Sequence, residues 1–66
     1  MTKLQALRQK TGLTQKEFAE KAGVNFRHFQ KLDNGEKNID GVAAITAVRI
    51  AKALGCTVED LMEEDL

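Results

Sequence analysis

Two short helical patterns, separated by a corner that contains a glycine, occupy the stretch from Thr14 to Gly35. Glu17 follows Thr14 by three residues, a spacing typical of a capping box, in which the two residues satisfy free backbone N–H groups at the start of a helix. We expect that helix to end at Gly23, because glycine adopts the left-handed backbone angles common at a helix C-terminus without a clash from a Cβ atom. Asn25 can cap a second helix that ends at Gly35. The stretch therefore predicts two helices that meet at a sharp corner.

Apolar residues recur at helical spacing in both predicted helices, which gives each helix one face for a core. The inward residues are Phe18, Ala19 and Ala22 in the first helix and Phe29 and Leu32 in the second. A helix, a short corner with a glycine and a second helix of about three turns make up a helix-turn-helix. We therefore predict this motif at about residues 14–34.

Several short segments occur in an order that is typical of one family. They are Leu13-Thr14-Gln15, Ala19, Gly23-Val24, Phe29 and Leu32-Asp33-Asn34-Gly35, followed by Ile50-Ala51-Lys52-Ala53-Leu54-Gly55 and Val58-Glu59-Asp60-Leu61. With these segments the chain resembles the Cro/C1-type (XRE-like) helix-turn-helix family of phage and bacterial transcription regulators over almost its whole length. The resemblance implies a lambda-repressor-like DNA-binding domain. The connection between Gly35 and Ile50 is longer than is usual in the family and lacks the usual proline.

The rest of the chain predicts further helices around this motif. The chain has 66 residues and no proline, a size and composition that suit one small helical domain. We expect a first helix over residues 2–11, a fourth helix capped by Asp40 that ends at Gly55, and a fifth helix capped by Thr57. The predicted fold is an all-α, compact five-helix bundle with an embedded helix-turn-helix, in a single domain over residues 1–66.

Residue types that carry catalysis are scarce in this chain. Serine is absent, and the single histidine and single cysteine, His28 and Cys56, belong to different predicted elements. We therefore expect no enzyme, no catalytic residues, no metal site and no small-molecule cofactor. No apolar run approaches the roughly 20 residues that span a bilayer, and no N-terminal signal is visible. We expect a cytoplasmic protein with no membrane partner.

Charge is unevenly distributed along the chain, although the formal net charge is zero. Residues 1–31 contain seven basic and two acidic residues, whereas residues 32–66 contain three basic and eight acidic residues. A positive surface around the helix-turn-helix can attract the phosphates of DNA. The alternative interpretation is that both halves present only solvated charges.

Outward-facing residues of the helix over residues 25–34 are candidates for reading DNA, because an α-helix fits the major groove. Arg27 can donate two hydrogen bonds to guanine, Gln30 can read adenine, and Phe26 can contact the methyl group of thymine. The family resemblance implies base contacts for Phe26, Arg27 and Lys31. An exposed phenylalanine is unusual there, so a core or dimer contact of Phe26 stays open as an alternative.

Four further polar residues are candidates for contacts with the phosphate backbone. The resemblance implies that Gln15 and Asn25 bind phosphate, and that Asn34 lies where the backbone amides of the following turn meet phosphate. His28 lies at the margin of the outward face, where it is either a simple surface histidine or a fourth phosphate contact.

Residues 41–48 are more apolar than a helix with one buried face requires. Such a segment is either buried on several sides by its own domain or covered by a second subunit. We expect a sequence-specific regulator of transcription, a repressor, that binds double-stranded DNA as a homodimer, because one helix reads few base pairs. The alternative is a protein-interaction module derived from a helix-turn-helix, such as an antitoxin or antirepressor, which the zero net charge, Phe26 and residues 41–48 favour.

Overall fold

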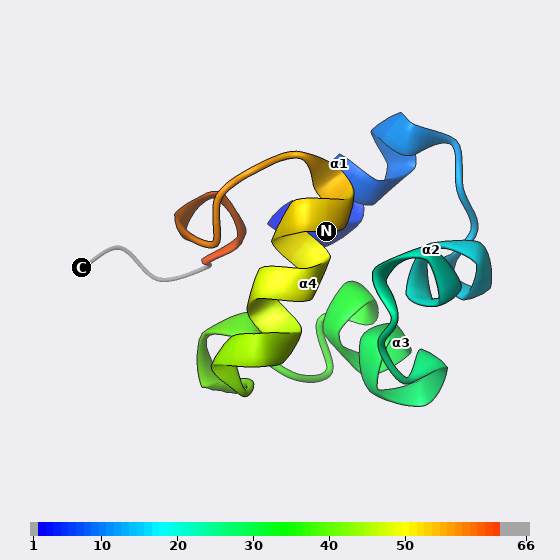
Figure 1. Ribbon diagram of the computed structural model, residues 1–66. Helices are drawn as coiled ribbons and strands as arrows, with labels where there is room; N and C mark the ends of the chain where they lie inside the picture. Colours follow the sequence, from blue (N-terminus) through cyan, green and yellow to red (C-terminus); the bar gives the residue numbers. More distant parts are fainter. Residues whose placement is uncertain (1, 63–66) are drawn as a thin grey trace.

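All the regular elements of the computed structural model, which describes residues 2–62, are helical (Figure 1). The four α-helices are α1 (Lys3–Thr11), α2 (Gln15–Ala22), α3 (Phe26–Asn34) and α4 (Ala44–Leu54). Two 3-10 turns, η1 (Ile39–Gly41) and η2 (Glu59–Leu61), precede and follow α4. The described residues contain no strand, so the prediction of an all-α fold is confirmed. The prediction of five helices is wrong, because residues 2–62 form four α-helices.

The fourth helix begins later than the sequence predicted. Asp40 does not cap it: the Asp40 N–H donates to Oδ1 of Asn38 at 2.9 Å, and Asn38 caps η1. Val42 then adopts an extended conformation, and α4 begins at Ala44 without a side-chain cap. The local turn closed by Asn38 thus replaces the helical start that was expected at Asp40.

The predicted fifth helix is reduced to the three-residue turn η2. Thr57 does act as a cap: its hydroxyl accepts from the Asp60 N–H at 3.3 Å, and the Asp60 carboxylate accepts from the Thr57 N–H at 3.1 Å. Met62 is nevertheless extended, which ends the turn. Leu61 is fully buried, so η2 serves to place one apolar side chain in the core. The predicted end of this helix, at residues 63–66, lies outside the described residues.

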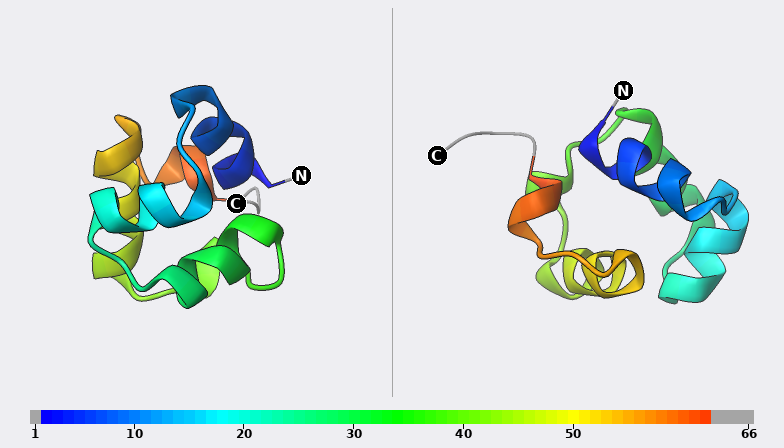
Figure 2. Two further views of the ribbon diagram at one scale, coloured as in Figure 1. Left: turned by 90° about the vertical axis from the view of Figure 1, so that its right-hand side faces the viewer. Right: turned by 90° about the horizontal axis from the view of Figure 1, so that it is seen from above.

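A stacked pair of phenylalanines forms the centre of the core. The rings of Phe18 in α2 and Phe29 in α3 have centroids 5.0 Å apart, and both side chains are fully buried. Such offset aromatic pairs contribute about 0.5–1.5 kcal/mol beyond the burial of their area. α2 contacts both α3 and α4, and α1 contacts α3, α4 and η2 around this pair (Figure 2). The aromatic pair therefore fixes α3 on a scaffold made by the other elements.

Residues 41–48 are not buried on several sides. Ala47 is buried, but the side chain of Ile45 is 60% exposed and that of Val48 is 38% exposed. These two residues are three apart and lie together on the outward face of α4. The alternative in which the domain itself covers this segment is therefore wrong for Ile45 and Val48.

Candidate nucleic-acid interface

The helix-turn-helix is built by the local bonds that its sequence predicted. The Thr14 hydroxyl accepts from the Glu17 N–H at 3.1 Å, and the Glu17 carboxylate accepts from the Thr14 N–H at 2.9 Å. The pKa of Glu17 is lowered, mainly by the hydrogen bond from the Thr14 backbone and to a lesser extent by the hydrogen bond with the Thr14 side chain. Gly23 ends α2 with φ of 73°, and its N–H donates to the carbonyls of Ala19 and Glu20. The capping box and the glycine corner are thus confirmed.

The two faces of α3 are clearly separated. Phe29, Leu32 and Asp33 are buried on the inward face, where they contribute to the core or to its polar edge. The exposed residues of α3 include the predicted base contacts Phe26, Arg27 and Lys31, whereas Gln30 and His28 are half-buried. Phe26 is 37% exposed and is absent from the buried core. A role for Phe26 as a core residue is therefore not supported.

Three of the predicted DNA contacts are brought together in a hydrogen-bonded chain. Nε2 of Gln15 donates to Oδ1 of Asn34 at 2.8 Å, and Nε2 of Gln30 donates to Oε1 of Gln15 at 3.4 Å. The same Gln15 nitrogen also donates to Oδ2 of Asp33 at 2.8 Å. The amide of Gln15 therefore joins the start of α2 to the middle and the end of α3, a role that its sequence position did not reveal.

Asp33 and Arg8 are important to this site and were not identified from the sequence. Asp33 is fully buried, and its Oδ1 accepts from Nε of Arg8 at 2.8 Å. Nη1 of Arg8 also donates to the carbonyl of Leu13 at 2.8 Å. One signal was present: Asp33 lies four residues after Phe29, on the inward face of its helix, where a carboxylate requires a cationic partner.

A family model described as the Cro/C1-type HTH DNA-binding domain matches residues 3–64. The chain belongs to this family. Membership confirms the resemblance read from the sequence and supports a DNA-binding regulator. The members of the family are in general DNA-binding regulators and not enzymes. Comparisons with curated proteins and with solved structures gave no match.

The predicted phosphate contacts of this Cro/C1-type domain form two groups at opposite ends of α3. At the start of α3, Oδ1 of Asn25 accepts from the His28 N–H at 3.1 Å and so caps the helix. Gln15 and Asn34 lie together at the other end. The structure thus brings the four residues into two pairs and not into one cluster.

Other kinds of site are poorly supported in the described part of this Cro/C1-type domain. Residues 2–62 contain no group of His, Cys, Asp and Glu side chains suited to hold a metal ion. Burial, and then the negative charge of Asp60, raise the pKa of the half-buried Cys56 thiol, which disfavours the reactive thiolate. No helix among these residues has the length and apolar character to cross a membrane.

Proposed function

We propose that this chain is a sequence-specific regulator of transcription, a repressor, which binds double-stranded DNA by inserting α3 into the major groove. The observation that supports this proposal is the separation of the two faces of α3. Its buried face is used for folding, whereas Phe26, Arg27 and Lys31 are exposed along its outer side. An exposed row of this kind on a helix held by a rigid scaffold suits contact with base edges.

Each exposed residue of α3 suits a different base contact. Arg27 can donate two parallel hydrogen bonds to O6 and N7 of guanine, and Lys31 can donate to the same acceptors. The ring of Phe26 can pack against the methyl group of thymine. Gln30 can read adenine with the groups that its bond to Gln15 leaves free.

The two pairs of polar residues at the ends of α3 suit the two backbones that border the groove. A helix of this length measures about 13 Å, since each residue adds about 1.5 Å. The major groove is about 12 Å wide. Asn25 and His28 at one end, and Gln15 and Asn34 at the other, can therefore each reach phosphates on one side of the groove. Hydrogen bonds fix the side chains of Asn25, Gln15 and Asn34 before DNA binds, which lowers the entropic cost of binding.

A homodimer is part of this proposal, because a single α3 reads too few base pairs for useful specificity. The exposed Ile45 and Val48 on α4 provide an apolar surface that a second copy can cover. The variant Ile45→Glu should then sediment as a monomer and keep its helical circular dichroism. A wild-type protein that is already monomeric at micromolar concentration, both alone and on DNA, would contradict the dimer.

The same two residues favour a second candidate function. Apolar side chains on α4 are not required for contacts of α3 with DNA. An exposed apolar surface of this kind also suits a module that binds another protein, such as an antitoxin or antirepressor. This candidate predicts that loss of Ile45 abolishes binding to the partner and leaves any DNA binding unchanged.

A selection from random duplex DNA at near-physiological salt tests the main proposal. The wild-type chain should enrich a palindromic site, and the Arg27→Ala/Lys31→Ala variant should not enrich it. Thermal unfolding of the variant provides the control, because both residues are exposed and their loss should leave the fold intact. A wild-type chain that enriches no sequence would refute sequence-specific binding and favour the protein-interaction module.

A further inference from the structure

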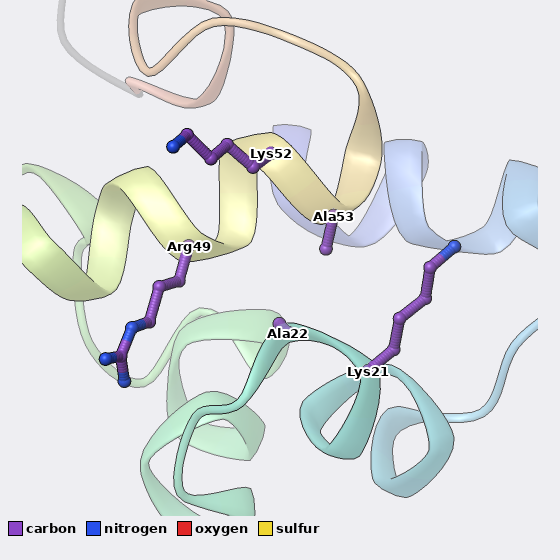
Figure 3. A pocket seen from close by; sticks show the side chains of 5 residues that line it. All are labelled: Lys21, Ala22, Arg49, Lys52 and Ala53. Carbon is purple, nitrogen blue, oxygen red and sulfur yellow. The ribbon is translucent and has the colours of Figure 1, made fainter.

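A shallow groove lies between the end of α2 and the second half of α4. Its volume is about 330 Å³, and the lining residues are Lys21, Ala22, Arg49, Lys52 and Ala53 (Figure 3). Three of the five carry a positive charge, and no acidic side chain among the described residues lines the groove. The two alanines leave a low floor between long basic side chains. This groove is therefore a concentrated positive surface outside the outward face of α3.

Arg49 connects this groove to the helix-turn-helix. Its Nη1 donates to the carbonyl of Gly23 at 3.2 Å, which places the guanidinium at the corner between α2 and α3. Gly23 is two residues before Asn25, the cap of α3 and a proposed phosphate contact. A guanidinium has five N–H donors, so the single bond to Gly23 leaves others for a ligand.

The geometry of the groove suits a ligand that is anionic and extended. The charged ends of Lys21, Arg49 and Lys52 point in different directions, and the groove is open to solvent (Figure 3). The three charged groups therefore do not surround a single small anion. Charges spread along a surface in this way suit a polyanion that passes over them, such as a nucleic-acid backbone, in which charges recur at short intervals.

We propose that Arg49, with Lys52 and Lys21 beside it, binds the DNA backbone next to the phosphate held by Asn25. The inference rests on the proposed function and extends the DNA contact from the helix-turn-helix onto α4. Arg49 supplies the directed hydrogen bonds, since its guanidinium is held at the corner by Gly23. The two lysines add charge without fixed geometry.

A purely structural role of Arg49 makes a different prediction. A cation at the end of α2 can simply stabilise the exposed carbonyls of that helix. In that case the loss of Arg49 lowers thermal stability and does not change how DNA affinity depends on salt. The variant Arg49→Gln separates the two roles, because it removes the charge, and its thermal unfolding and its salt dependence of DNA affinity are measured independently.

The experiment measures the affinity for a selected DNA site over a range of salt concentrations. Each phosphate contact contributes about 0.9 to the slope of log affinity against log salt. A dimer on a palindromic site makes this contact once in each half-site, so Arg49→Gln should lower the slope by about 1.8, and a fourfold rise in salt should weaken its binding about 12-fold less than that of the wild type. The exposed Lys10, on α1, provides the matched control, because Lys10→Gln also removes one positive charge.

Phosphate ethylation interference identifies the contact itself. With the wild-type chain, ethylation of one phosphate beyond those near α3 should block binding in each half-site, and this block should be lost with Arg49→Gln. Equal slopes for the wild type and Arg49→Gln, or an equal fall with Lys10→Gln, would overturn the proposal. Either outcome would leave the proposed DNA binding by α3 intact. A wild-type chain whose affinity for DNA does not depend on salt would refute both the DNA binding and the contact of Arg49.

Discussion

The carboxylate of Asp33 in α3 accepts a hydrogen bond of 2.8 Å from Nε of Arg8 in α1, and this ion pair is almost fully removed from solvent. The second oxygen of Asp33 accepts from Gln15 in α2 at 2.8 Å, and its backbone carbonyl accepts from the Thr2 hydroxyl at 3.1 Å. The end of α3 is therefore tied to two other helices by one residue. The outward face of α3 is oriented by these bonds as well as by the apolar core.

Loss of Arg8 should strongly destabilise the fold. Arg8→Met leaves the buried Asp33 carboxylate without its cation, which typically costs about 3–5 kcal/mol. Urea unfolding followed by circular dichroism measures this change. The double variant Arg8→Met/Asp33→Leu serves as the control, because replacement of a whole buried pair by apolar residues is often neutral. A loss below about 1 kcal/mol in the single variant would show that the pair is not needed.

Enlargement of Ala19 should disrupt the packing of α2. Ala19 is 1% exposed and belongs to the core cluster with Phe18 and Phe29. Ala19→Leu should lower the free energy of unfolding by about 1–3 kcal/mol or more, because extra methyl groups force neighbouring side chains out of position. The exposed Ala44 provides a matched control, since Ala44→Leu adds the same groups at the surface. Equal stability of the wild type and Ala19→Leu would contradict the close packing described above.

Phe26 should recognise thymine through its methyl group. Replacement of the contacted thymine by uracil removes one methyl group, so wild-type affinity should fall about fourfold, which corresponds to about 0.8 kcal/mol. The variant Phe26→Ala should bind both DNA duplexes equally. Fluorescence anisotropy with the two duplexes gives this comparison. If uracil weakens both proteins by the same factor, Phe26 does not make the contact.

Acid should weaken the capping box at the start of α2. The pKa of Glu17 is lowered from its ordinary value of 4.5 by hydrogen bonds from Thr14. Its contribution is therefore complete above this ordinary pKa and is lost as the pH falls through the lowered pKa of the folded state. Glu17→Gln keeps an acceptor for the Thr14 N–H but does not titrate. Between about pH 6 and pH 3, Tm should fall more for the wild type than for this variant; parallel curves would argue against the role of Glu17.

The helix-turn-helix was predictable because its signals are local. Thr14, Glu17 and Asn25 act on backbone groups three residues away, and Gly23 acts through its own φ angle. Such features depend little on the rest of the chain. The helix bounds at these positions, and the opposite faces of Phe29 and Arg27 on α3, therefore followed from spacing alone, whereas the burial of Asp33 did not.

The later elements and the polar contacts of the site depend on tertiary structure. Asn38 competes with Asp40 for the same segment, and the sequence does not show which of them caps a turn. The capping pair of Thr57 and Asp60 forms, but the burial of Leu61 and the extended Met62 limit the element to one turn. Likewise, the partners of Gln15 lie on α3, so the sequence predicted a polar surface residue and not its bonds.

The division of α3 into two faces has an evolutionary consequence. Residues that hold the helix in place, such as Phe29 and Asp33, are distinct from those exposed for contact, such as Arg27 and Lys31. Substitution of the exposed residues leaves the core undisturbed. A descendant of this protein could therefore acquire a different target sequence through a few surface changes, with no compensating mutation in the interior.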